Sequence, residues 1–187
     1  WNMSSSSRTM SASAAPSDVA IRWGVRVPLR NGLHLSAILY SPCNVAAAPA
    51  IVAMTPYVAQ AHHEQAMYFA GRGFAFLSVD VRGRGNSDGE FHPLNETHDG
   101  VDVIEWVARQ SYCNGRVAMW GASYLGYCQW AVAREPPLAL ATIVPVAAPF
   151  RGVDSPVRNN IFTPYSMQWL TIVSGRTSQD RMFLDQS

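Results

Sequence analysis

One serine in this sequence stands where a side-chain hydroxyl could act as a nucleophile. The apolar run 117–120 is typical of a buried parallel strand, and it breaks at Gly121, two residues before Ser123. A helix-like stretch follows over 124–134. A serine between a strand and a helix has its hydroxyl forced outward, as the nucleophile of acyl transfer requires. The alternative is that Ser123 only caps the helix, because the usual second glycine of such a turn is replaced by Leu125.

Acyl transfer through a serine also needs hydrogen-bond donors for the negatively charged oxygen that develops on the substrate. The backbone N–H of Tyr124, directly after the serine, is one candidate donor. Tyr57 is a second, because it follows the apolar run 50–55 and its phenol can donate a hydrogen bond. Sites in open α/β sheets form at the carboxyl ends of strands, where we expect both residues to lie. The alternative for Tyr57 is a packing role after a proline turn.

The remaining pattern predicts the sheet that would position these residues. Two alternating segments, 21–27 and 33–40, flank an Asn-Gly turn and predict an antiparallel hairpin. Apolar runs typical of buried strands then alternate with helix-like stretches, which favours an α/β fold with a mostly parallel sheet. The strands are expected at 50–55, 74–81, 117–120 and 139–146, and the helices at 64–72, about 95–108 and 124–134.

Composition limits what this chain can be. Its 187 residues are 48% hydrophobic, which is enough for one domain with a sizeable core. The net charge is +1 with scattered basic residues, so we expect neither a nucleic-acid surface nor a membrane-binding patch. The three cysteines lack metal-ligand spacing, and we expect a cytoplasmic protein without metal or cofactor. Residues 1–18 are rich in Ser and Ala and are expected to form a disordered leader or the remnant of a tag.

Five motifs occur together along the chain. They are Thr55-Pro-Tyr57, Asp80-Val-Arg-Gly-Arg-Gly-Asn-Ser-Asp-Gly-Glu-Phe91, Asp99-Gly-Val-Asp-Val-Ile-Glu-Trp106, Cys113-Asn-Gly-Arg-Val117 and Gly121-Ala-Ser-Tyr-Leu-Gly126. In this order and spacing they resemble the cocaine esterase and X-Pro dipeptidyl-peptidase family, the CocE/NonD hydrolases. That family also holds α-amino acid ester hydrolases and glutaryl cephalosporin acylases. The likeness covers about 21–146 and accounts for Leu125, because the family's elbow is G-x-S-Y-x-G.

The resemblance implies an α/β-hydrolase fold and a role for each matching residue. Ser123 matches the family's nucleophile, Tyr57 its oxyanion tyrosine and Tyr124 its backbone oxyanion donor. The loop 80–89 matches a structural turn beneath the site, so Arg82 and Arg84 are expected to brace loops. Asp99 and Asp102 are expected on a solvated helix face.

The general base that this chemistry needs is missing from the expected position. In α/β hydrolases an acid and then a histidine follow the serine in the chain. Here the aspartates Asp154, Asp180 and Asp185 follow Ser123, whereas His34, His62, His63, His92 and His98 all precede it. In the resembling family the catalytic Asp and His follow a helical cap inserted after the strand that matches 139–146. We therefore expect residues 19–149 to be the N-terminal part of a hydrolase domain and 150–187 the beginning of that cap.

The expected function is a serine hydrolase that cleaves a small ester or amide through an acyl-enzyme on Ser123. The catalytic acid and base would lie beyond this chain or on a second chain, as in a protein nicked within the cap, and the 187-residue piece alone would be nearly inactive. Phe162, Tyr165 and Trp169 are candidates to line the acyl pocket, with packing inside the cap as the alternative. The alternative function is a non-catalytic relative that serves as a binding or assembly module.

Overall fold

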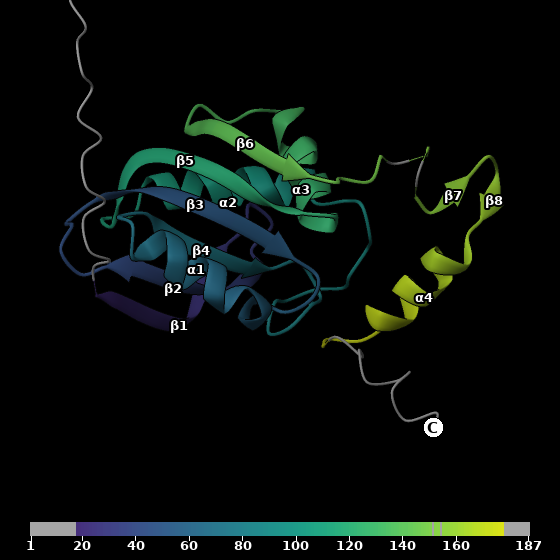
Figure 1. Cartoon of the computed structure of the whole chain (residues 1–187), viewed down its shortest axis with the longest axis horizontal. Coiled ribbons are helices and arrows are strands. Elements are labelled where there is room, and N and C mark those ends of the chain that lie inside the picture. Colours follow the sequence, from purple (N-terminus) through teal and green to yellow (C-terminus); the bar gives the residue numbers. More distant parts are fainter. Residues whose placement is uncertain (1–17, 151, 154, 178–187) are drawn as a thin grey trace, which may run out of the picture.

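A six-stranded mixed sheet forms the centre of the protein (Figure 1). The computed structural model describes residues 18–150, 152–153 and 155–177, so that most of the predicted leader and Asp154, Asp180 and Asp185 lie outside the described residues. The strand order is β1-β2-β4-β3-β5-β6. The strands are β1 (Val19–Pro28), β2 (His34–Pro42), β3 (Ala48–Thr55), β4 (Ala75–Asp80), β5 (Cys113–Ala122) and β6 (Leu140–Val146).

The predicted α/β architecture is confirmed, including the antiparallel hairpin at its start. β1 pairs antiparallel with β2, and β2 pairs antiparallel with β4. The four strands β4, β3, β5 and β6 are parallel to one another. The helices are η1 (Ala59–His62), α1 (His63–Ala70), α2 (Thr97–Ala108), α3 (Tyr124–Ala133) and α4 (Pro164–Ile172), and a small hairpin pairs β7 (Val157–Arg158) with β8 (Ile161–Phe162).

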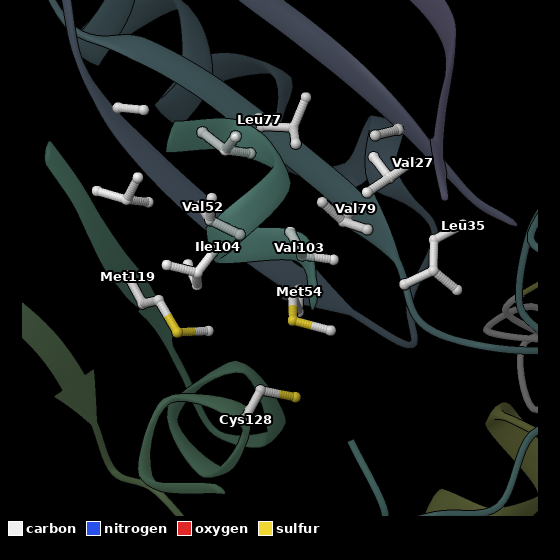
Figure 2. Close-up of a cluster of buried hydrophobic side chains, with 14 of the residues drawn as sticks. Val27, Leu35, Val52, Met54, Leu77, Val79, Val103, Ile104, Met119 and Cys128 are labelled. Atoms are coloured by element: carbon white, nitrogen blue, oxygen red, sulfur yellow. The ribbon is translucent and has the colours of Figure 1, made fainter. Parts of the chain in front are cut away.

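Alternation along the central strands supplies both faces of the core. In β3, Val52 and Met54 pack against α2 and α3, whereas Ile51 and Ala53 pack on the face that α1 covers. This period of two places one apolar layer on each side of the sheet. Figure 2 shows part of the larger layer, in which Val103 and Ile104 of α2 meet the side chains of the strands.

The elements beyond β6 leave the six-stranded sheet. The hairpin β7–β8 and helix α4 lie beyond the carboxyl ends of the parallel strands (Figure 1). Thr163 caps helix α4, because its hydroxyl accepts a hydrogen bond from Ser166 N at 3.2 Å. The first residue of the helix is Pro164. Among the described residues, no helix combines the length and the apolar character that a membrane span requires.

The prediction that 139–146 is a buried strand is wrong in one respect. The strand β6 forms, but its burial alternates and Val144 and Val146 are about half exposed. The reason is its place at the edge of the sheet, since among the described residues only β5 pairs with it.

The prediction that Asp99 and Asp102 lie on a solvated helix face is also wrong. Asp99 is buried and accepts two hydrogen bonds from Arg82, at 2.9 and 2.6 Å. Asp102 accepts from the backbone N and the Nε of Arg30, at 2.9 and 2.8 Å. Both carboxylates therefore tie α2 to loops that come from other parts of the chain. Their spacing of three residues places them on one helix face, but only the fold brings the arginines there.

The Arg82–Asp99 pair predicts a measurable loss of stability when one partner changes. Asp99→Asn leaves the guanidinium of Arg82, whose side chain is about three-quarters buried, without its anionic partner. We expect the free energy of unfolding to fall by about 2–3 kcal/mol in urea denaturation. Glu105→Gln, an exposed change on the same helix, should alter it by less than ~0.5 kcal/mol. Equal effects of the two substitutions would show that the pair contributes nothing specific.

Candidate active site

Ser123 sits on a strained turn between β5 and α3. Its backbone has φ 56° and ψ −121°, a conformation that residues other than glycine rarely adopt. Ser123 N donates to Val146 O at 2.8 Å, and Tyr127 N donates to Ser123 O at 3.0 Å. The turn is thus held by the end of β6 on one side and by the first turn of α3 on the other. This is the geometry that the elbow motif predicts.

The two glycines of the elbow are required by close packing. Gly121 has φ 138°, and a Cβ there would lie 2.6 Å from the Leu125 side chain. A Cβ at Gly126 would lie 2.8 Å from Ala148 Cβ and 3.2 Å from Val146 O. The second glycine therefore lets α3 approach the chain that leaves β6. This packing explains why the second glycine, Gly126, stands three residues after Ser123 and directly after Leu125.

A buried glutamine that the sequence reasoning missed holds the same elements together. The Nε2 of Gln129 donates to Gly121 O at 3.0 Å and Leu125 O at 3.1 Å, while its Oε1 accepts from Val144 N at 2.8 Å. Strand β5, helix α3 and strand β6 are thereby joined by one fully buried side chain. The only signal in the sequence is a single polar residue within an otherwise apolar helix.

Tyr57 lies next to Ser123, as the sequence predicts. The turn that carries it is shaped by Thr55, whose hydroxyl accepts from Tyr57 N at 3.0 Å and bonds His62 Nε2 at 3.1 Å. The phenol oxygen accepts a hydrogen bond from Trp169 Nε1 at 2.9 Å, and Tyr57 and Ser123 line the same cavity. Burial raises the pKa of the Tyr57 phenol, and the hydrogen bond from Trp169 opposes the rise. The phenol is consequently a neutral hydrogen-bond donor at physiological pH.

The serine opens into a cavity of about 410 Å³. Five of the six residues selected from the sequence contribute to its wall, namely Ser123, Tyr57, Tyr124, Tyr165 and Trp169. Phe162 is the exception: it lies on β8, it is exposed, and it is not among the described residues that line the cavity. The remaining wall is supplied by Leu94, Ala147, Ala148, Pro149, Ser155 and Ser166.

Tyr124 is fixed by a buried carboxyl group that the sequence reasoning did not select. Its hydroxyl donates a short hydrogen bond to Glu96 Oε1 and accepts one from Leu94 N at 2.7 Å. Burial raises the pKa of Glu96 to about 7, partly opposed by the bond from Tyr124. Tyr124 is the first residue of α3, so its backbone N–H has no acceptor within the helix and is free to serve a ligand.

Arg84 braces the site from below, in agreement with the loop-bracing role predicted for it. Its fully buried guanidinium donates to Pro56 O at 2.7 Å, to Val173 O at 2.7 Å and to Gly175 O. Pro56 precedes Tyr57, and Val173 follows α4. One side chain thus connects the loop of the candidate oxyanion tyrosine with the helix that carries Trp169.

No general base is found at the cavity within the described part of the chain. The described residues that line it include no histidine and no carboxylate. His62 ends η1 and directly precedes α1, and burial lowers the pKa of its imidazole. Among the described residues, no cluster of three His, Cys, Asp or Glu could hold a metal ion.

The sheet order, the strained serine and the adjoining cavity define an α/β-hydrolase fold. A solved α-amino acid ester hydrolase superposes with a TM-score of 0.78 at 24% identity, over 90% of this chain and 32% of that one. An aminopeptidase from the marine sediment archaeon Thaumarchaeota archaeon has a TM-score of 0.65 at 25% identity, over 71% of this chain and 26% of its own.

The chain belongs to the X-Pro dipeptidyl-peptidase (S15) family, whose model matches residues 31–185. Cocaine esterase of Rhodococcus sp. (strain MB1 Bresler) is 33% identical over 131 residues, which are 66% of this chain and 23% of the relative. Xaa-Pro dipeptidyl-peptidase of Lactiplantibacillus plantarum (strain ATCC BAA-793 / NCIMB 8826 / WCFS1) is 37% identical over 98 residues, 43% of this chain and 12% of the relative. The chain therefore spans less than a quarter of the length of these two relatives.

The buried Glu96 carboxyl predicts a pH dependence of stability. The folded state holds its proton up to about pH 7, whereas the unfolded chain releases it near 4.5. Stability is therefore present at low pH and is lost as the pH rises through this interval, by up to ~3 kcal/mol. Glu96→Gln keeps an acceptor for Tyr124 and should remove this loss.

Urea denaturation at pH 5 and pH 7.5 measures the difference. The wild type should lose more stability between the two pH values than Glu96→Gln, and the exposed change Glu64→Gln should behave as the wild type. An unchanged pH slope in Glu96→Gln would contradict the raised pKa.

Proposed function

We propose that this chain carries the nucleophile and the oxyanion donors of a serine hydrolase that cleaves an ester or an amide. The observation that carries the proposal is the strained Ser123, which lines one cavity together with Tyr57 and Tyr124. The names of the relatives, an esterase and a dipeptidyl-peptidase, support the same two bond types.

In the proposed reaction a general base removes the proton from Ser123 Oγ as this oxygen attacks the carbonyl carbon of the substrate. The carbonyl oxygen becomes an oxyanion and accepts hydrogen bonds from Tyr57 O–H and Tyr124 N–H. The tetrahedral intermediate collapses, the bond to the leaving group breaks, and the protonated base gives its proton to that group. Water then releases the acyl group by the reverse sequence, which regenerates Ser123.

We propose that the base and its acidic partner come from residues beyond this chain or from a second chain. The cavity wall supports this, since its described residues include no histidine and no carboxylate. Without a base, a serine hydroxyl is a poor nucleophile. The 187-residue piece by itself is accordingly proposed to be nearly inactive.

The acyl group of the substrate is proposed to lie against Trp169 and Tyr165. Both line the cavity beside Ser123, and apolar surface predominates in its wall. Phe162 is exposed on β8 and outside this wall, so it has no part in the proposal.

A fluorophosphonate probe tests the nucleophile. The protein expressed from its complete gene should be labelled at Ser123, because the probe reacts with activated serines. Ser123→Ala should lose labelling and hydrolysis of p-nitrophenyl acetate by at least ~10³-fold, and Ser111→Ala, an exposed serine in the turn after α2, should retain both. Labelling that persists in Ser123→Ala would disprove the assignment.

A second candidate, a binding module without catalysis, is favoured by the lack of a histidine among the described cavity residues. It predicts that the complete wild-type protein resists the probe and hydrolyses no ester, yet still binds ester analogues in the cavity. Mass spectrometry of the native material distinguishes the case of a nicked protein, which requires a second polypeptide.

A further inference from the structure

Trp169 contacts the side chains of both residues that are proposed to supply the oxyanion donors. Its indole Nε1 lies 2.9 Å from the Tyr57 hydroxyl oxygen. Its ring stacks on the ring of Tyr124, with 5.4 Å between centroids and 17° between planes. Tyr57 belongs to the loop after β3, and Tyr124 begins α3, so one residue of α4 touches both sides of the site.

The direction of the hydrogen bond decides what the contact can do. An indole N–H is a donor only, so the Tyr57 oxygen must be the acceptor. One lone pair of the phenol is thereby occupied, and the phenolic proton must point to another partner. Tyr57 and Ser123 line the same cavity, into which this proton can point. The indole therefore leaves the phenolic proton available to the reacting centre.

We propose that Trp169 is a positioning residue that orients the Tyr57 O–H towards the substrate oxyanion. This inference rests on the proposed function, in which Tyr57 is an oxyanion donor. A phenolic proton can rotate between two orientations in the ring plane, and only one of them serves the site. The hydrogen bond from the indole N–H fixes the orientation of the phenolic proton before the oxyanion forms. Electrostatic stabilisation is most effective when the donors are oriented in advance.

The surrounding contacts keep the indole in place. Arg84 bonds Pro56 O on the Tyr57 side and Val173 O on the α4 side, both at 2.7 Å. Phe91 packs edge-on against Trp169, with 6.4 Å between ring centroids. The donor and the acceptor of the Trp169–Tyr57 bond are thus fixed to a common support, although 112 residues separate them in the chain.

A double-mutant cycle separates this role from simple packing. Trp169→Phe keeps an aromatic ring against Tyr124 but removes the N–H, and Tyr57→Phe removes the proposed oxyanion donor. The complete protein is assayed with p-nitrophenyl acetate, with kcat and KM measured separately for each variant. Trp23→Phe, an exposed tryptophan on β1, is the matched control.

We expect Trp169→Phe to lower kcat about 5- to 10-fold with KM within twofold, because the bond acts in the transition state. In the Tyr57→Phe background the same substitution should leave kcat unchanged. Trp23→Phe should match the wild type.

A fall in kcat of equal size in both backgrounds would overturn the inference and leave the proposed function intact. An unchanged kcat in Tyr57→Phe alone would instead overturn the oxyanion role of Tyr57, and with it this inference. If Trp169→Phe lowers the Tm, the residue is replaced by benzothienylalanine, which substitutes sulfur for the N–H without changing the ring shape. The same 5- to 10-fold loss in that isostere supports the inference, and full activity overturns it.

Discussion

The site depends on one buried positive charge, the guanidinium of Arg84. Arg84 is fully buried, and its Nε and Nη1 donate to the backbone carbonyls of Pro56, Val173 and Gly175, whereas Nη2 has no hydrogen-bond partner among the described residues. Burying a guanidinium costs several kcal/mol unless its donors are satisfied, so the two segments that supply the carbonyls must stay together. Burial also lowers the pKa of Arg84, while the nearby Asp80 opposes that change. This constraint holds α4 over the ends of the strands.

A second constraint is the strain at Ser123. A positive φ at a non-glycine residue costs on the order of 1–3 kcal/mol and persists only where the surroundings over-determine it. Here the surroundings are the hydrogen bond to Val146 O, the three bonds of the buried Gln129, and the two glycines that allow close approach. The backbone N–H of Tyr124 and the serine hydroxyl are presented together as a result. Both constraints act on rigid elements, which suits a site whose proposed chemistry requires donors in fixed positions.

Prediction from the sequence succeeded where the signal is local and failed where the interacting residues are distant in the sequence. The elbow and the turn at Tyr57 are short motifs at strand ends, and parallel strands bring their carboxyl ends to one edge. The spacing of Asp99 and Asp102 says only that they share a helix face; that Arg82 and Arg30 reach this face is a matter of loop positions. The apolar run 139–146 predicted a strand correctly, but whether a strand is central or lies at the edge depends on its neighbours. No sequence pattern marks Glu96, whose pKa is raised because the fold buries its carboxyl group.

By itself the sequence determined the α/β class and the main alternation of strands and helices, and it supplied the candidates for the nucleophile and the two oxyanion donors. These follow from hydrophobic period, from turn residues and from motifs that span only a few positions. The tertiary structure alone decided that Trp169 donates to Tyr57, that Phe162 lies outside the cavity, and that Arg84 joins both halves of the site. The physical reason is that these contacts join residues up to 112 positions apart, and no local preference encodes contacts that depend on how the sheet and helix α4 pack together.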